Sequence, residues 1–153
     1  MKILFTDNDG VLTDSNVYYS KWGAKLKKYS VRDGMAVEML KKIGVETIIL
    51  TKEKCKIAKK RAKKLKIKCY SGIQDKKAFI VKYSKKKKIK ASDIYFIGDD
   101  INDIKSMLAC KFSACPADAI APVQKSAKYV SRFDGGKKAF RDIAEYIIKN
   151  VND

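Results

Sequence analysis

Short apolar runs alternate along this chain of 153 residues with longer segments in which apolar residues recur every three or four positions. Apolar runs of about four to eight residues that end at turn residues are typical of buried strands. The segments expected to form strands are 3–6, 45–50, 67–70, 94–97, 112–114 and 128–130. The periodic segments predict helices at 31–43, 54–65, 74–88, 98–109 and 135–148. This alternation of strands and helices predicts the α/β fold class.

Residues 11–30 depart from this alternation and predict a β-hairpin. The stretches 17–19 and 25–29 are short, aromatic and partly alternating, and Gly23 lies between them. An isolated two-stranded ribbon is marginally stable, so this hairpin needs a surface to pack on. Trp22, the single tryptophan, lies near the expected turn, where a local contact and an interface role both remain open.

Turn residues mark the ends of the predicted elements. Asp33 is the expected N-cap of the helix at 31–43, and Gly44 is its expected terminator. Internal repeats and low-complexity linkers are absent, and the chain is long enough for one domain with a substantial core. We therefore expect a single domain over residues 1–153.

The residue types present restrict the chemistry. Histidine is absent, which excludes a histidine general base and leaves acid–base work to carboxylates. The four cysteines show no Cys-x-x-Cys spacing, so we expect reduced thiols in a cytoplasm and no zinc site. We expect no signal peptide, because Met1 and Lys2 lead directly into the first strand. No apolar run approaches membrane-spanning length, so we expect a cytoplasmic protein without a membrane partner.

The formal net charge of +18 raises the hypothesis of a nucleic-acid-binding domain. Of the 35 basic residues only four are arginines, the residue favoured for bidentate contacts to bases and phosphates. The densest lysine run, at 85–88, lacks the interleaved aromatic residues that a stacking surface for single strands requires. A solvated, lysine-coated surface that attracts small anionic substrates is the favoured interpretation, and nucleic-acid binding is the less favoured alternative.

Two carboxylates follow the first predicted strand directly. Asp7 and Asp9 are separated by one residue, and Gly10 permits a tight turn or the close approach of a ligand. Ligands of open α/β sheets bind beyond the carboxyl ends of the strands, so both side chains should project into one pocket. Neighbouring carboxylates repel, and they need a bound cation, a shared proton or both. The pair suits a metal-assisted nucleophile beside a general acid, although its spacing alone also fits a cap or a solvated turn.

Polar residues at three later points in the chain indicate the same chemistry. Thr51 ends the second strand before a helix N-terminus, where a hydroxyl and free N–H groups can hold phosphate oxygens. Lys76 lies at a helix N-terminus, against the helix dipole, so its position requires a specific reason. The strand at 94–97 ends in a glycine and is followed by three more carboxylates: Asp99, Asp100 and Asp103.

Residues 7–14, Asp-Asn-Asp-Gly-Val-Leu-Thr-Asp, resemble the first motif of haloacid dehalogenase-type phosphatases, particularly their sugar-acid phosphatase branch. Thr51, Lys76 and the Gly-Asp-Asp-x-x-Asp run at 98–103 resemble the other three motifs of that family, in the same order. The resemblance covers nearly the whole chain. It implies a Rossmann-like, mostly parallel sheet with helices on both faces, a hairpin flap and no cap domain. Two positions depart from the family pattern: Asn8 replaces an apolar residue, and Lys52 replaces a glycine.

This resemblance implies a Mg²⁺-dependent phosphatase that works through an aspartyl-phosphate. Asp7 is the implied nucleophile, and Asp9 is the general acid that later deprotonates the hydrolytic water. Mg²⁺, which prefers oxygen ligands, would be held by Asp7, Asp99 and the backbone carbonyl of Asp9. The implied phosphate ligands are the Asn8 backbone N–H, Thr51 and the catalytic Lys76. The implied supports are Asp103, which orients Lys76, and Asp100, which is a ligand through water or only a helix cap.

The resemblance also implies an eight- or nine-carbon 3-deoxy-ulosonic acid phosphate as substrate. Arg32 lies in an Arg-Asp-Gly triplet that matches the octulosonate 8-phosphate phosphatases. Glu53, Arg61 and Lys64 resemble the ulosonate 9-phosphate phosphatases, in which they bind the sugar acid across a subunit boundary; a solvated basic helix is the simpler alternative. Arginine commonly replaces Glu53 in octulosonate enzymes, and Lys137 follows a Gly-Gly pair beside the family's substrate pocket. The eight-carbon octulosonate is favoured, and a KDN or N-acetylneuraminate 9-phosphate phosphatase is the alternative.

The lack of a cap implies that neighbouring subunits close the site, as in the tetrameric sugar-acid phosphatases. We therefore expect a homotetramer with sites near the subunit interfaces. In the family, the hairpin at 11–30 lies over the site and packs against other subunits. A catalytically silent assembly domain is an alternative from another class. The intact set of catalytic residues argues against it: Asp7, Asp9, Lys76 and Asp99.

Overall fold

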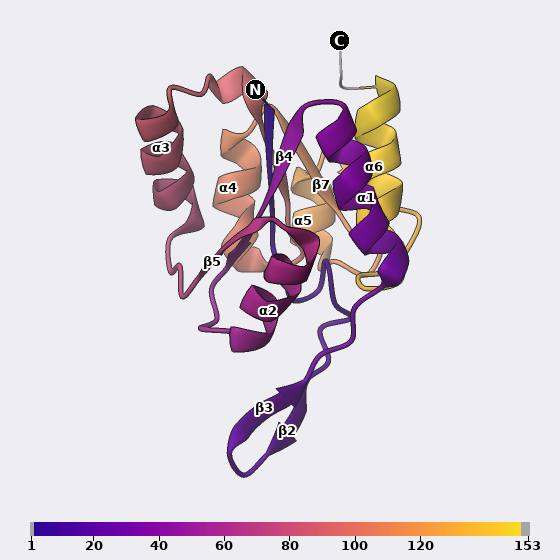
Figure 1. Cartoon of the computed structure of the whole chain (residues 1–153). Helices are drawn as coiled ribbons and strands as arrows, with labels where there is room; N and C mark the ends of the chain where they lie inside the picture. Colours follow the sequence, from indigo (N-terminus) through magenta and orange to yellow (C-terminus); the bar gives the residue numbers. More distant parts are fainter. Residues whose placement is uncertain (1, 151–153) are drawn as a thin grey trace.

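A six-stranded sheet forms the centre of the computed structural model, which describes residues 2–150 (Figure 1). Its strands are β1 (Lys2–Thr6), β4 (Val45–Thr51), β5 (Lys68–Ser71), β6 (Ile94–Ile97), β7 (Phe112–Cys115) and β8 (Tyr129–Val130). They lie in the order β5-β4-β1-β6-β7-β8, and each neighbouring pair is parallel. All six predicted strands are present, with ends shifted by at most one residue.

Helices cover both faces of the sheet, as the resemblance implied. One face carries α1 (Val31–Lys42), α2 (Lys56–Leu65) and α6 (Ala139–Asn150), and the other carries α3 (Lys76–Lys87), α4 (Ile104–Ala109) and α5 (Ala121–Ser126). Figure 1 shows α1 and α6 side by side. Short 3₁₀ turns at Ala91–Asp93 and Ile101–Asp103 precede β6 and α4. Within residues 2–150, no helix is both long and apolar enough to cross a membrane.

The alternation of side chains along β1 supplies both layers of the core. Leu4 belongs to the apolar cluster under α1 and α6, whereas Ile3 and Phe5 belong to the cluster under α3, α4 and α5. All three are almost completely buried. A parallel strand with helices on both faces must be apolar on both sides, which explains why residues 3–5 of β1 are all apolar.

The predicted hairpin extends away from the body of the molecule (Figure 1). Its strands are β2 (Tyr18–Ser20) and β3 (Gly23–Leu26), joined by the two residues Lys21 and Trp22. Gly23 therefore begins β3 and does not lie in the turn. Trp22 is 85% exposed, and the neighbouring tyrosines of β2 are also exposed, so this chain alone leaves the aromatic surface of the hairpin uncovered.

The structure corrects several local predictions. The helix predicted over 98–109 begins only at Ile104, after the 3₁₀ turn at Ile101–Asp103. Ser30, not Asp33, is the N-cap of α1, and its side chain accepts a hydrogen bond from the Asp33 N–H. Asp33 is buried and instead accepts a hydrogen bond from the Arg141 N–H in the first turn of α6. The C-terminal helix begins at Ala139, after the Gly135 turn that was predicted to open it. The short helix α5 was not predicted at all.

Candidate active site

The carboxyl ends of β1 and β6 bring the two predicted aspartate clusters together. These strands are adjacent and parallel, and the Asp7 N–H donates to the Ile97 carbonyl over 2.9 Å. One carboxylate oxygen each from Asp7, Asp99 and Asp103 lies within 4.8 Å of the others. Parallel strands end at the same edge of a sheet, so residues about ninety positions apart in the sequence become neighbours.

Lys76 lies between two of these carboxylates. Its Nζ is 2.8 Å from Oδ2 of Asp7 and 2.7 Å from Oδ1 of Asp103. Burial lowers the pKa of Lys76, but the two carboxylates outweigh it and hold that pKa above its ordinary value. Oδ2 of Asp103 accepts a hydrogen bond from the Asp99 N–H, so both oxygens of Asp103 are occupied. Asp103 thus contacts Lys76 directly, and its role in orienting the lysine for catalysis stays a prediction.

The carboxylates of Asp7 and Asp99 together suit a divalent cation. Burial raises the pKa of Asp99 to about 8, and the charge of Asp7 adds to the effect. Burial also raises the pKa of Asp7, to about 7, although Lys76 opposes the shift. Oδ1 of Asp99 is buried and has no hydrogen-bond partner among residues 2–150. Two crowded carboxylates with an unpartnered oxygen fit Mg²⁺, which takes oxygen ligands and favours the ionised carboxylates.

Asp9 has different surroundings from this cluster. Its two oxygens accept hydrogen bonds from Lys27 Nζ at 2.7 and 2.8 Å, and Oδ1 also accepts from Asn8 Nδ2 at 3.0 Å. Lys27 Nζ lies 3.0 Å from Oε2 of Glu53 as well. The Asp9 carboxylate therefore lies outside the cation cluster, and the predicted metal contact of its backbone carbonyl stays a prediction.

Sequence reasoning missed Lys27. It is one of 31 lysines, and its side chain is completely inaccessible, whereas most of the lysines are exposed. The hairpin at 11–30 returns to the body at this residue. No local signal was available, because Lys27 is one of three lysines around the end of β3.

The side chain of Asn8 explains how a polar residue is accommodated in the first motif. Its Oδ1 accepts a hydrogen bond from the Tyr29 hydroxyl at 3.0 Å, while its Nδ2 bonds to Asp9. Its backbone N–H donates to Oδ1 of Asp7 at 2.7 Å. Asn8 thus links the end of the hairpin to the first motif, and its role as a phosphate ligand stays a prediction. Thr51 is buried at the carboxyl end of β4, on the same edge of the sheet.

The other predicted residues lie further out. Arg61 donates to the Ser30 carbonyl at 3.0 Å, and its guanidinium carbon lies 5.2 Å from the centre of the Tyr29 ring. The side chains of Arg32, Lys64 and Lys137 are exposed. Asp100 is exposed and caps the 3₁₀ turn by accepting a hydrogen bond from the Ile101 N–H. Their roles with substrate stay predictions.

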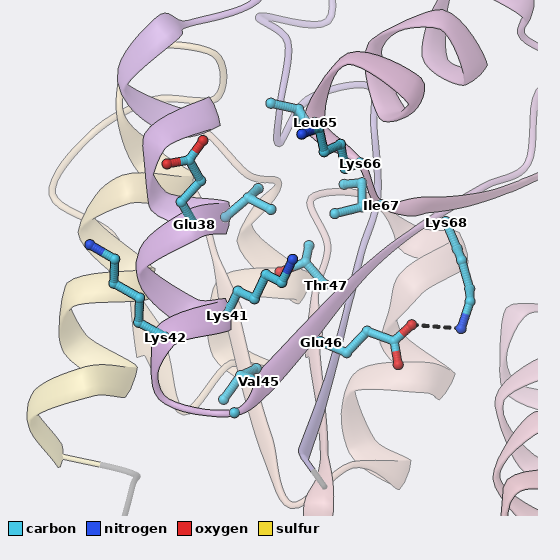
Figure 2. Close-up of a pocket in the computed structure, with 12 residues that line it drawn as sticks. Glu38, Lys41, Lys42, Val45, Glu46, Thr47, Leu65, Lys66, Ile67 and Lys68 are labelled. Carbon is cyan, nitrogen blue, oxygen red and sulfur yellow. Dashed lines mark hydrogen bonds and ion pairs between the residues drawn. The ribbon is translucent and has the colours of Figure 1, made fainter.

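A separate cavity of about 1030 Å³ lies at the opposite end of the sheet (Figure 2). It is bounded by the end of α1, the beginning of β4 and the end of α2. Thr47 lines it with a buried hydroxyl that has no partner among the described residues, and Glu46 pairs with Lys68 over 2.7 Å on one side. Val45 begins β4 here, whereas Thr51 ends β4 at the carboxylates. The cavity and the carboxylate site are therefore distinct.

Known proteins share both the sequence and the fold of this chain. A model of haloacid dehalogenase-like hydrolases matches residues 53–135. The 3-deoxy-D-manno-octulosonate 8-phosphate phosphatase KdsC of Haemophilus influenzae is 32% identical over 150 residues, which are 97% of this chain and 83% of that protein. KdsC of Yersinia pestis is 30% identical over 149 residues, covering 97% of this chain and 80% of that protein.

Two solved structures extend this similarity. The cobalt-bound octulosonate 8-phosphate phosphatase of Haemophilus influenzae has a TM-score of 0.92 and 31% identity, covering 97% of this chain and 88% of that one. The Moraxella catarrhalis enzyme, in complex with a magnesium ion, a phosphate ion and KDO, has a TM-score of 0.92 and 30% identity, covering 97% and 86%. By family model, sequence identity and fold, this chain belongs to the haloacid dehalogenase-like hydrolases, as an enzyme of their phosphatase branch.

Proposed function

We propose that this protein is a Mg²⁺-dependent phosphatase that acts on a 3-deoxy-ulosonic acid phosphate, with 3-deoxy-D-manno-octulosonate 8-phosphate favoured. One observation carries the proposal: Asp7 and Asp9 share the turn after β1, with Lys76 bound to the first and Lys27 to the second. The relatives named as phosphatases of this octulosonate are similar over nearly the whole chain, which supports the substrate class.

Asp7 is the nucleophile of this reaction. Lys76 holds its Oδ2 over 2.8 Å and brings a positive charge to the place where the phosphoryl oxygens gather. One carboxylate oxygen of Asp7 attacks phosphorus, a new P–O bond forms, and the bond between phosphorus and the sugar oxygen breaks. Bound Mg²⁺ supplies further neutralisation of the carboxylate and phosphoryl charges. Because Asp103 fixes Lys76 over 2.7 Å, the ammonium needs no rearrangement before attack.

Asp9 is the general acid and base. It protonates the departing sugar oxygen and afterwards takes a proton from the water that hydrolyses the aspartyl-phosphate. The surroundings of the two carboxylates differ, since Asp7 is bound by Lys76 inside the buried cluster and Asp9 by Lys27 at its edge. Two neighbouring carboxylates in different environments are what separate nucleophile and acid roles require.

A nine-carbon substrate is the second candidate, and Glu53 favours it. Glu53 accepts a hydrogen bond from Lys27, which also bonds to Asp9 of the same chain. An arginine at position 53, as in many octulosonate enzymes, would place a like charge beside Lys27. The pairing of Lys27 with an acidic residue thus supports the nine-carbon alternative, while the names of the relatives support the eight-carbon substrate.

We also propose a cytoplasmic homotetramer in which neighbouring subunits close the sites. The exposed aromatic hairpin supports the assembly, because such a surface is unfavourable in water. The four cysteines are unpaired, which suits a reducing compartment.

A phosphate-release screen with Mg²⁺ tests the proposal. The panel contains eight- and nine-carbon ulosonic acid phosphates, sugar phosphates without a carboxylate, and p-nitrophenyl phosphate. We expect the highest kcat/KM on an ulosonic acid phosphate, and Asp7→Asn serves as the inactive control. Oligonucleotide binding is titrated with salt in parallel. Absence of phosphate release from every compound, together with salt-sensitive oligonucleotide binding, would favour the nucleic-acid alternative.

A further inference from the structure

Lys27 connects three parts of the molecule that are far apart in the sequence. It follows β3 directly, at the point where the hairpin returns to the body. Its Nζ donates to both oxygens of Asp9, at 2.7 and 2.8 Å, and to Oε2 of Glu53 at 3.0 Å. One ammonium thus joins the hairpin, the turn after β1 and the loop after β4.

The three contacts fix the ammonium in place. An ammonium has three N–H donors, and here each has a carboxylate oxygen within 3.0 Å. The side chain of Lys27 is completely inaccessible, and a charge withdrawn from water is tolerated only when it is paired and hydrogen-bonded. A flexible surface lysine would lack these restraints.

Lys27 also determines the orientation of the Asp9 carboxyl group. Asn8 Nδ2 and Thr13 Oγ1 approach only Oδ1 of Asp9, at 3.0 and 3.5 Å. Among residues 2–150, Lys27 alone donates to Oδ2. Without Lys27, the carboxyl group of Asp9 would be free to rotate about its Cβ–Cγ bond. In the acid form one oxygen carries the proton, and the ammonium keeps the other oxygen and Glu53 as acceptors.

We infer that Lys27 is a positioning residue, which holds the general acid in line with the leaving oxygen and ties the hairpin to the acid. This inference rests on the proposed function, because it assigns Asp9 the acid role. A sugar alkoxide is a poor leaving group and needs a well-placed proton donor, whereas a nitrophenolate leaves without one. Loss of Lys27 should therefore reduce turnover of sugar phosphates far more than turnover of aryl phosphates.

Lys28 provides a matched control on the same segment. Its Nζ pairs with Asp14 over 2.9 Å, so it also ties the end of the hairpin to the loop after β1. Its side chain is 65% exposed, and its partner is not one of the proposed catalytic residues. If the hairpin merely needed an ionic anchor, Lys27→Met and Lys28→Met would have similar effects.

The experiment measures kcat and KM for an ulosonic acid phosphate and for p-nitrophenyl phosphate. Lys27→Met should lower kcat on the sugar-acid phosphate by about 10- to 100-fold, and on the aryl phosphate by at most about threefold, since general acids contribute about 10²–10⁴-fold. Lys28→Met should leave kcat on both substrates unchanged. Lys27→Arg, which restores the charge in a different shape, should recover part of the loss and serves as the test if Lys27→Met does not fold.

A double-mutant cycle distinguishes action through Asp9 from a general effect. In an Asp9→Asn background, Lys27→Met should lower sugar-acid phosphate turnover by less than about twofold, because the acid is already lost. Equal losses on both substrates, or additive losses in this background, would overturn the inference. A wild-type protein that releases phosphate from neither substrate would instead refute the proposed function.

Discussion

A Cβ atom added to Gly10 would lie 1.8 Å from Oδ2 of Asp99, so the main chain of the first motif directly contacts the carboxylate of the fourth. Gly10 also has a φ of +84°, which disfavours other residues. We predict that Gly10→Ala abolishes cation binding and activity, because Asp99 must move. Titration calorimetry with Mg²⁺ and a phosphatase assay measure both.

Gly44→Ala is the control for backbone strain. Gly44 has a φ of +78°, but nothing lies within 4 Å of an added Cβ. We expect this variant to lose about 1–2 kcal/mol of unfolding free energy and to keep its activity. An active Gly10→Ala enzyme would contradict the assigned contact between the two motifs.

The two aspartates of the first motif should respond differently to amidation. Asp7→Asn removes the nucleophile, so no phosphoenzyme should form with any substrate. Asp9→Asn should lower turnover of sugar phosphates by about 10²-fold or more and turnover of aryl phosphates much less. Phosphoenzyme trapping and paired substrate assays check this. Equal losses for Asp9→Asn on both substrates would contradict its role as the acid.

Metal binding should release protons near neutral pH. Burial raises the pKa of Asp7 to about 7 and of Asp99 to about 8, from 3.8. Without a cation, the stability contributed by their protonated forms is complete below pH 3.8 and lost as pH rises through 7 and 8. Mg²⁺ favours the ionised forms, so its stabilising effect should grow over the same range.

Melting temperatures with Mg²⁺ and with EDTA at pH 6, 7.5 and 9 measure this difference. Calorimetry in two buffers of different ionisation enthalpy gives the number of protons released. The Asp99→Asn variant should lose the effect of Mg²⁺. Full phosphatase activity after chelation would show that the cation is not required.

Asp142 should be a major contributor to stability outside the site. Its buried carboxylate accepts hydrogen bonds from the Tyr129 hydroxyl at 2.7 Å, from Ser131 Oγ at 3.0 Å, and from the backbone and side chain of Arg132. Burial raises the pKa of Asp142, but these donors outweigh it and hold that pKa below 3.8. Asp142→Asn should cost about 1–3 kcal/mol of unfolding free energy above pH 4, and less as pH falls through the folded-state pKa.

Glu145→Gln is the matched control on the same helix. Glu145 pairs with Arg141 one turn away, and both side chains are partly exposed. Exposed ion pairs contribute little to stability, so we expect the free energy of unfolding to change by less than about 0.5 kcal/mol. Urea unfolding of both variants gives the comparison. Equal losses of unfolding free energy would show that Asp142 stabilises the fold no more than an exposed ion pair does.

The aromatic hairpin should be an assembly surface. Trp22 is 85% exposed at its tip, and we predict that Trp22→Ser weakens a homotetramer measured by light scattering at several concentrations. Leu108→Ser alters a residue that is 69% exposed on α4 and should leave the assembly unchanged. A fully active monomeric wild-type protein would contradict the assembly.

Local sequence determined the central strands and the aspartates that follow them. The central strands β1, β4, β6 and β7 are mainly apolar, because parallel strands buried on both faces require such runs. Asp7 and Asp99 were predicted from their positions after strands together with the resemblance of their motifs to the family, and the adjacent parallel strands β1 and β6 bring them to one edge. That edge is built into the α/β topology, so motifs far apart in the sequence could be placed together without coordinates.

The tertiary structure alone decided the contacts of Lys27 and Asp33. Lys27 meets Asp9 and Glu53 across 18 and 26 positions, and Asp33 meets the N–H of Arg141 across 108. No periodicity or propensity encodes such pairings, because they depend on how the hairpin and α6 return to the body. The sequence does not distinguish a buried lysine from a lysine on the solvated surface. Burial separates them, since a charge removed from water must find partners, and the fold determines which carboxylates are within reach.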